Sequence, residues 1–323
     1  MTPQTHATTQ PRASGRNPLP RHDPRLALPL QPQPKHSHKP TKPEMKEEIR
    51  PMQTITDRLV VEAVLGLPQM KDKTLLHLAV VGSRSKAIAS KDSDYDVKAV
   101  VLHSVADYLL QNITPSKAFE TSIVDPETGE VVEVEGTLVD YLTMQKYALS
   151  TNTAACEAFY GLVIHQTPES EYLKELFLKA YDPRVLVLSY QGLLKHELKK
   201  ARKQGRSGQI KHAANMVFYA SMVHLASSSQ EPPIQNAFQH VQSLQIDPAL
   251  RENMLVLYRQ RMADKSRTDA DTAPFAAFLQ NAEELEAPPC IKSKDEIESL
   301  RAEANARFVE TIASDRMEVP VLR

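Results

Sequence analysis

The 323 residues carry 39 Lys and Arg against 40 Asp and Glu, a formal net charge of -1, so a polyanion has to be bound by a local basic patch and not by a global field. No apolar run approaches the roughly 20 residues needed to span a bilayer, which excludes a helical membrane protein and a membrane partner. The two cysteines, Cys156 and Cys290, form no disulfide framework, which favours a reducing compartment such as the cytoplasm.

The first 43 residues differ in composition from the rest of the chain. Residues 1–43 contain ten prolines, seven Lys or Arg and a single acid, Asp23. Such a segment cannot bury a core, and we expect a disordered tail. The alternative is an organellar targeting peptide, which the basic composition fits but the prolines oppose, because that peptide has to form an amphipathic helix. A third reading is that translation starts at Met45 or Met52, where helical periodicity begins.

The segment 44–150 is predicted to be a small α+β domain with a mixed sheet. Its apolar residues change from helical spacing to continuous or alternating runs, as expected where a helix is followed by strands. The predicted elements are a helix at 55–65, buried strands at 75–81 and 96–102, a short helix at 105–111 with Ser104 as its N-cap, and strands at 119–124 and 131–135 around the turn DPETGE.

From Thr137 onward the chain is predicted to be almost wholly helical. Apolar residues at spacings of three and four predict helices at 137–150, 153–164, 169–180, 185–204, 209–227 and 247–263, and a polar helix at 293–314. The predicted layout is a tail (1–43), the α+β domain (44–150), a helical domain (151–290), and a C-terminal helix with a tail (291–323).

Two carboxylates stand at the start of the second strand. Residues i and i+2 of a strand share a face, so Asp94 and Asp96 point the same way. Two neighbouring carboxylates repel and would have raised pKa values unless a cation lies between them. Hard carboxylate oxygens suit Mg²⁺, which normally takes its remaining ligands from water and substrate phosphates.

A Gly-Ser pair ends the first strand and supplies a phosphate site. Gly82 lets the backbone turn sharply and approach a ligand closely. The amide and hydroxyl of Ser83 can bond phosphate oxygens, and Arg84, with Lys86 beside it, adds positive charge. A phosphate cradle next to paired carboxylates is what phosphoryl or nucleotidyl transfer requires.

A site for two metal ions needs a third carboxylate. Glu133 and Glu135 share one face of the strand VVEVEG, and Asp140 lies just beyond it, where a helix is predicted to begin. Spacing alone does not choose among the three.

The pattern Val81-Gly82-Ser83, a spacer of ten residues, and Asp94-Tyr95-Asp96-Val97 resembles the signature of the DNA polymerase β-like nucleotidyltransferase superfamily. The run from Ser93 to Lys98 is most similar to the RNA-repair-pathway nucleotidyltransferases, and the resemblance covers roughly residues 75–225. In that group a third carboxylate opens a helix, an Asn follows about a dozen residues later, and a Glu comes soon after. Counting back from Asn152 and Glu157 selects Asp140, with Glu135 as the fallback.

The resemblance implies a mixed sheet flanked by helices, with 44–150 as the catalytic domain and 151–290 as the substrate-binding domain. It implies transfer of a nucleoside monophosphate from a nucleoside triphosphate to a hydroxyl with two Mg²⁺ ions held by Asp94, Asp96 and Asp140, and it places Lys98 beside the nucleotide. One departure is that the family usually has GSRxxG, whereas this chain has Ala87 at the last position.

A basic helix offers a site for the acceptor. Within residues 195–211, steps of three and four place Lys195, Lys199, Arg202 and Arg206 along one helical face, which could contact RNA or the triphosphate. Our leading hypothesis is therefore transfer to RNA. The alternatives are transfer to a protein side chain, as in AMP-adding antitoxins, and a non-catalytic nucleotide or RNA sensor on the same fold.

Overall fold

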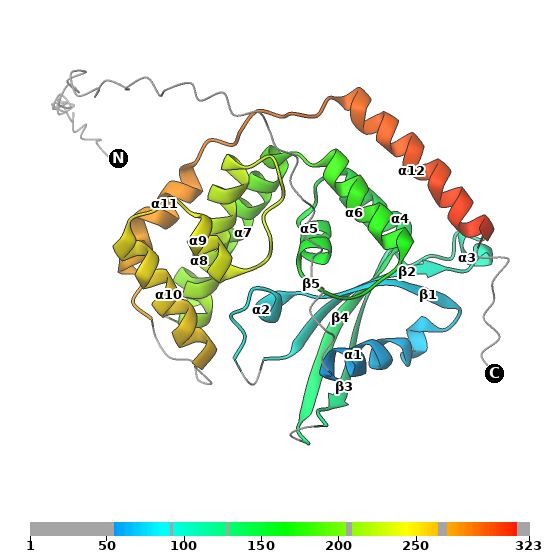
Figure 1. Cartoon of the computed structure of the whole chain (residues 1–323), viewed down its shortest axis with the longest axis horizontal. Helices are drawn as coiled ribbons and strands as arrows, with labels where there is room; N and C mark the ends of the chain where they lie inside the picture. The colour runs from blue at the N-terminus through cyan, green and yellow to red at the C-terminus, as the bar shows by residue number, and fades with distance from the viewer. Residues whose placement is uncertain (1–54, 91–92, 127–128, 205–208, 264–269, 315–323) are drawn as a thin grey trace, which may run out of the picture. The chain divides into compact units, whose positions relative to one another are not determined.

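The computed structural model describes residues 55–90, 93–126, 129–204, 209–263 and 270–314 (Figure 1). The expected tail at 1–43, the alternative starts at Met45 and Met52, and Arg206 lie outside these residues. Within them, no helix combines the length and the apolar composition that crossing a membrane requires.

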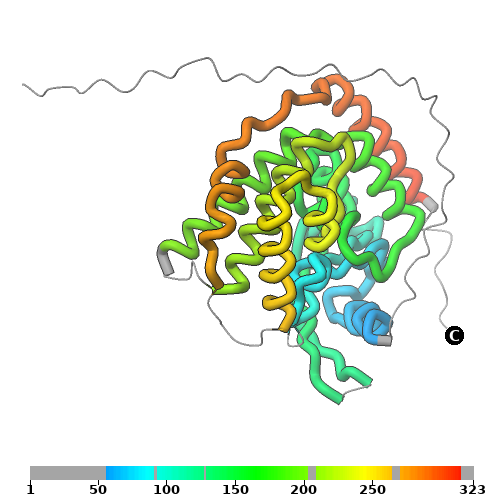
Figure 2. Tube along the Cα trace, turned by 60° about the vertical axis from the view of Figure 1, so that its left-hand side comes forward, coloured from blue at the N-terminus to red at the C-terminus, as the bar shows by residue number. Residues whose placement is uncertain are grey.

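Five strands form one mixed sheet in the order β3-β4-β2-β1-β5. The strands are β1 (Lys73–Val80), β2 (Tyr95–His103), β3 (Ser116–Val124), β4 (Val131–Asp140) and β5 (Leu162–Gln166). Only β2 and β4 are parallel among the paired neighbours of the described sheet, and the other pairs are antiparallel. The hairpin of β3 and β4 extends beyond the other strands in both views (Figures 1 and 2).

Helices make up most of the remainder. In chain order they are α1 (Ile55–Leu65), α2 (Gly82–Ser85), α3 (Val105–Leu109), α4 (Tyr141–Leu149), α5 (Thr153–Tyr160), α6 (Pro168–Ala180), α7 (Pro183–Gln204), α8 (Ile210–Ser228), α9 (Ala237–Ser243), α10 (Pro248–Ala263), α11 (Ala276–Glu284) and α12 (Lys294–Ser314), with short 3-10 turns η1 (Pro68–Met70) and η2 (Ala273–Phe275). Helices α7 and α8 pack together, and α10 and α11 pack on α8 (Figure 2).

The two faces of the sheet are buried against different partners. Val97, Ala99 and Val101 of β2 point toward α1 and pack with its Val60 and Val64. The alternate residues of β2, including Val100 and Leu102, join the large cluster formed with the helices from α4 onward. Because successive strand residues point to opposite faces, every even-numbered residue of β2 lies on the side of these later helices.

The predicted fold class is confirmed, and so are the first helix, the first two strands and the hairpin. Three details differ. Strand β4 continues to Asp140, so the following helix begins at Tyr141 and not at 137. The predicted helix at 153–164 ends at Tyr160, because the β-branched run that follows pairs with β1 as strand β5. Helices α9 and α11 were not expected.

Candidate active site

Asp94 and Asp96 lie where β2 begins, on the face that looks toward the later helices. Asp94 immediately precedes the strand and is exposed, and Asp96 is its second residue and is partly buried. The alternation of the strand therefore brings the two carboxylates to one face, as the sequence predicts.

Strand pairing adds further carboxylates to this place. Asp96 of β2 lies opposite Glu135 of the parallel strand β4, and Glu135 lies opposite Glu120 of β3. Glu133 stands one step before Val134, the partner of Tyr95, and so lies beside Asp94. Carboxylate oxygens of Asp94, Glu133 and Glu135 all lie within 4.8 Å of one another. We call Asp94, Asp96, Glu133 and Glu135 the acidic row.

Crowding changes the acidity of the row. Burial, followed by repulsion from Asp94, raises the pKa of Asp96, and the positive charges of Lys211 and Lys86 oppose this rise. Desolvation, followed by repulsion from Asp94 and Glu120, raises the pKa of Glu135. The row therefore favours the binding of a cation, which would relieve the repulsion.

The turn after β1 lies directly against Asp96 of the acidic row. Gly82 has a φ of +65°, which favours glycine, and a methyl group built on it would lie 2.0 Å from Oδ2 of Asp96. The amide of Val81 donates to the carbonyl of Asp96 at 2.7 Å, which continues the pairing of β1 with β2 up to this point. Only glycine fits here, because a side chain would displace the carboxylate.

Arg84 links the Gly82 turn to the segment that carries Asp94. Its Nε donates to the carbonyl of Asp94 at 3.1 Å, a second guanidinium nitrogen donates to the carbonyl of Ser93, and the group lies 4.0 Å from the centre of the Tyr95 ring. These contacts fix the backbone that carries Asp94. Arg84 thus contacts the main chain at Asp94 and not its carboxylate, and its predicted contact with phosphate stays a prediction.

The turn containing Ser83 ends in a glycine-like conformation although it contains no second glycine. Ala87 has a φ of +59°. Its amide donates to the backbone carbonyl of Arg84, and the amide of Ile88 donates to the backbone carbonyl of Ser83. These two bonds form the hydrogen-bond pattern of a Schellman motif. Ala87 therefore adopts a left-handed conformation that glycine would adopt without strain.

Lys98 lies two residues beyond Asp96 on the same face and is paired. Its ammonium lies 3.0 Å from Glu157 of α5 and also donates to the carbonyl of Ala154 at 3.3 Å. Asn152 caps this helix by accepting from the amide of Ala154 at 2.8 Å. Lys98, Asn152 and Glu157 thus join α5 to the strand that carries Asp96.

The structure does not bring Asp140 to the acidic row. Asp140 lies opposite Val101, five residues along β2 from Asp96, which corresponds to roughly 16 Å of strand. It is 2% exposed, accepts from the hydroxyl of Tyr108 at 2.7 Å, and caps α4 by accepting from the amide of Thr143 at 3.1 Å. The expectation that Asp140 lies with the carboxylate pair is thereby corrected, and the fallback, Glu135, occupies that place.

Lys86 is a buried cation of the Gly82 turn. It is 7% exposed, and its ammonium lies 4.8 and 4.9 Å from the ring centres of Phe218 and Tyr219 on α8. Burial lowers its pKa, while Glu157 and Asp96 favour its charged form. The Gly82 turn is therefore anchored on the helical region through Lys86.

The basic helix is oriented by Glu197. Glu197 of α7 is buried and in contact with His212 of α8. Lys195 and Lys199 each stand two positions from Glu197, about 200° around the helix, so they point to the opposite, exposed side. Lys211 of α8, which belongs to the same predicted basic segment, has a charge that acts on Asp96.

Comparisons with known proteins give matches over most of the chain. The family model described as the RNA repair pathway DNA polymerase beta family matches residues 59–310. A solved structure of a nucleotidyltransferase-like protein from Exiguobacterium sibiricum 255-15 is similar over 81% of this chain and 81% of its own, at 10% identity and a TM-score of 0.25. No curated protein sequence is significantly similar. The family match spans the acidic row, the Gly82 turn and the helices through most of α12.

Proposed function

The chain belongs to the RNA repair pathway DNA polymerase beta family, whose members are nucleotidyltransferases, and we propose that it is a Mg²⁺-dependent enzyme that moves a nucleoside monophosphate from a nucleoside triphosphate to a hydroxyl group of RNA. The observation that carries the proposal is the acidic row against Gly82. It is supported by the match over residues 59–310, which includes both features.

Asp94, Asp96 and Glu135 are the proposed metal ligands, with Glu133 beside them. Their oxygens are hard donors on one face, and repulsion between the carboxylates adds to the desolvation that raises the pKa values of Asp96 and Glu135, so a bound cation would relieve that repulsion. When bound there, two Mg²⁺ ions would neutralise the triphosphate and polarise the acceptor hydroxyl. In the transfer, the acceptor oxygen bonds to the α-phosphorus, the bond from that phosphorus to the β-phosphate oxygen breaks, and pyrophosphate leaves.

The residues of the Gly82 turn are the proposed phosphate cradle. Gly82 and Ser83 present backbone next to Asp96 without an intervening side chain, so phosphate oxygens can lie close to the acidic row. Lys86 and Lys211 supply the nearby positive charge, as their effect on Asp96 indicates. Arg84 and Lys98 position the loop and α5 through the contacts described above.

Lys195 and Lys199 are proposed to contact the RNA acceptor. Both are exposed on the side of α7 that faces away from Glu197, where a sugar-phosphate backbone can reach them. The free cysteines, Cys156 and Cys290, are compatible with a reducing compartment, and we propose a cytoplasmic location.

The test is pyrophosphate release from each of the four ribonucleoside triphosphates, with Mg²⁺ and total RNA. Wild type is compared with the double variant Asp94→Asn/Asp96→Asn, which keeps the side-chain shapes but removes both charges. We expect release that depends on RNA and falls by roughly a hundredfold or more in the double variant, since metal ions supply several kcal/mol of transition-state stabilisation.

The same assay separates the rival functions. Labelled nucleotide recovered on a protein, with no RNA dependence, would replace RNA by a protein acceptor. Tight triphosphate binding without any pyrophosphate release would identify a sensor. Release that is unchanged in the double variant would refute the acidic row as the active site.

A further inference from the structure

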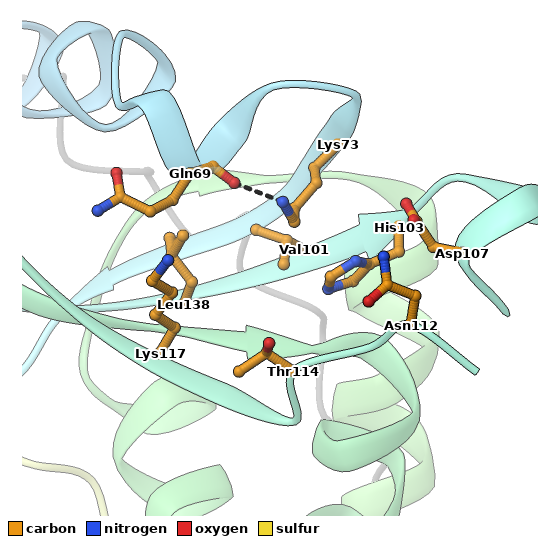
Figure 3. A pocket seen from close by; sticks show the side chains of 9 residues that line it. All are labelled: Gln69, Lys73, Val101, His103, Asp107, Asn112, Thr114, Lys117 and Leu138. Atoms are coloured by element: carbon orange, nitrogen blue, oxygen red, sulfur yellow. Dashed lines mark hydrogen bonds between the residues drawn. The ribbon is translucent and has the colours of Figure 1, made fainter. Parts of the chain in front are cut away.

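A cavity of about 210 Å³ lies at the other end of the sheet from the acidic row (Figure 3). Val101 of β2 and Leu138 of β4, both buried, line its apolar side, and His103 follows on the same face of β2. His103 is seven residues beyond Asp96, or roughly 23 Å along the strand, and the two residues point to opposite faces of the sheet. The cavity is therefore separate from the proposed active site in both position and direction.

Two lysines from different strands line the cavity. Lys73, at the start of β1, has an ammonium that donates to the carbonyl of Gln69 at 2.5 Å (Figure 3). An ammonium carries three donors, so this bond holds Lys73 at the cavity and leaves two N–H groups for a ligand. Lys117 of β3 is exposed and lies opposite Leu138, so its charge is available without displacing a protein partner.

His103 adds a neutral polar group to the lining of the cavity. The side chain is 7% exposed and packs edge-on against Tyr108, with the ring centres 6.1 Å apart. Burial lowers its pKa, Lys73 lowers it further, and Asp140 and Asp107 oppose the decrease. The neutral imidazole has one N–H donor, and the second nitrogen becomes a donor if a bound anion favours protonation.

The remaining polar lining also favours an anion. Asn112 and Thr114, on the connection from α3 to β3, contribute an amide and a hydroxyl, and both are exposed. Asp107 is the acid among the described lining residues, and its carboxylate already accepts from the hydroxyl of Ser104 at 2.7 Å. Two lysines against one engaged carboxylate leave the lining with a formal charge of +1.

We propose that this cavity binds a small free phosphate anion, inorganic phosphate or pyrophosphate. Donors reach it from β1, β2, β3 and the α3–β3 connection, an arrangement that a tetrahedral anion with several oxygens satisfies and a planar carboxylate with two oxygens does not. The size agrees, because pockets for drug-sized ligands start near 300 Å³ and this cavity is smaller. The inference does not depend on the proposed transfer reaction.

The experiment is calorimetric titration of the metal-free full chain with inorganic phosphate and with pyrophosphate, repeated with acetate. Variants Lys117→Ala and Lys73→Ala are compared with Lys146→Ala, which removes an exposed lysine of α4 that does not line the cavity. We expect saturable phosphate binding that weakens by roughly tenfold or more in each cavity variant, as for loss of a charged hydrogen bond, and by less than about twofold in Lys146→Ala. The ring signals of His103 should shift in proton NMR as phosphate binds.

Several results would overturn the proposal. These are no binding of either phosphate at millimolar concentration, equal affinity in Lys117→Ala and Lys146→Ala, and acetate binding as tightly as phosphate. Loss of binding in Asp94→Asn/Asp96→Asn but not in Lys117→Ala would assign the anion to the other end of the sheet. Because Lys117 is exposed, its replacement should leave the fold intact, and circular dichroism verifies this even if Lys73→Ala fails to fold.

Discussion

Two carboxylates of strand β4, Glu135 and Asp140, are five residues apart and differ in both exposure and hydrogen bonding. Glu135 is exposed and stands among Asp94, Glu120 and Asp96, whose repulsion contributes to its raised pKa. Asp140 is buried and has two hydrogen-bond donors, the hydroxyl of Tyr108 and the amide of Thr143. The difference teaches that a carboxylate's partners, not its place at a strand end, separate a ligand-binding group from a structural one.

The largest expected effect is a difference in transfer activity between a variant of Glu135 and a variant of Asp140. Glu135→Gln should lower nucleotidyl transfer by roughly a hundredfold or more, because it removes a proposed metal ligand while keeping the side-chain volume. Asp140→Asn, with the same chemical change, should stay within about threefold per folded molecule, since Asn still caps a helix well. Initial rates of pyrophosphate release, normalised to folded protein, measure both.

A reversal of that order would return Asp140 to the active site. It would require β4 and β2 to pair in a different register from the one in which Asp96 faces Glu135. Equal losses in both variants, with unchanged melting curves, would contradict the assignment of Asp140 to a purely structural role.

The next effect is on stability, where we expect Asp140 to be the important residue. Asp140→Ala should lower the free energy of unfolding by roughly 2 kcal/mol, because it removes a helix N-cap and leaves the Tyr108 hydroxyl without its acceptor. Urea denaturation at pH 7 measures the loss. Tyr108→Phe is the matched control and should cost about 1 kcal/mol, since it removes only one of the two hydrogen bonds. A change below that of Tyr108→Phe would contradict the capping role.

The carboxylate pair could be predicted from the sequence because its signal is local. Asp94 and Asp96 are two residues apart where β2 begins, so strand periodicity places both on one face, and the Gly-Ser pair after the preceding strand completes the sequence pattern. The same argument gave the hairpin and therefore Glu133 and Glu135 as candidates.

Asp140 was selected by its spacing to Asn152 and Glu157, and that spacing does not specify which carboxylate lies opposite Asp96 in the sheet. Gly136 and Thr137 weaken the strand pattern after Glu135, and the helix was therefore predicted to start there. The structure shows why glycine is needed: a side chain at 136 would lie 2.6 Å from Phe119 and from Val97. Strand β4 therefore continues through Gly136 to Asp140, which places Asp140 opposite Val101 and away from the pair.

The helical contribution to the site was beyond the reach of the sequence. Lys211 of α8 acts on Asp96 although more than a hundred residues separate the two in sequence, and α8 also packs Phe218 and Tyr219 on Lys86 of the Gly82 turn. The buried position of Glu197 likewise decides that Lys195 and Lys199 point outward. Such placements depend on tertiary packing, which helical periodicity does not specify.

A smaller effect tests whether the acidic row destabilises the metal-free protein. The raised pKa of Asp96 means that its ionised form is disfavoured in the folded state, so stability falls as the pH rises through that pKa. Asp96→Asn should therefore stabilise the metal-free protein at pH 7, by less than about 1 kcal/mol because solvent screens a half-exposed group. The gain should vanish below the ordinary carboxyl pKa of about 4.

Urea denaturation with a chelator at both pH values measures this gain. Adding Mg²⁺ should stabilise the wild type, because an ion that binds only the folded state shifts the unfolding equilibrium toward it. The same addition should not stabilise Asp96→Asn, which lacks a proposed metal ligand. A variant that is less stable than wild type at pH 7 without metal would show that Asp96 is a satisfied structural group like Asp140.

The smallest expected effect concerns Ala87, which has a left-handed backbone conformation in the turn beside the acidic row. A left-handed alanine costs roughly 1 kcal/mol or more, and glycine returns part of that through the flexibility of the unfolded chain, so Ala87→Gly should stabilise by about 0.5 kcal/mol. Ala89→Gly in the same loop is the control and should destabilise, because Ala89 does not have a positive φ. Urea midpoints measure both, and transfer activity should change by less than about twofold, since both Schellman hydrogen bonds already form with alanine. If Ala87→Gly instead destabilised the protein and raised activity, the alanine would be holding the turn in a less active shape, and the departure from the family's glycine would then favour a sensor over an enzyme.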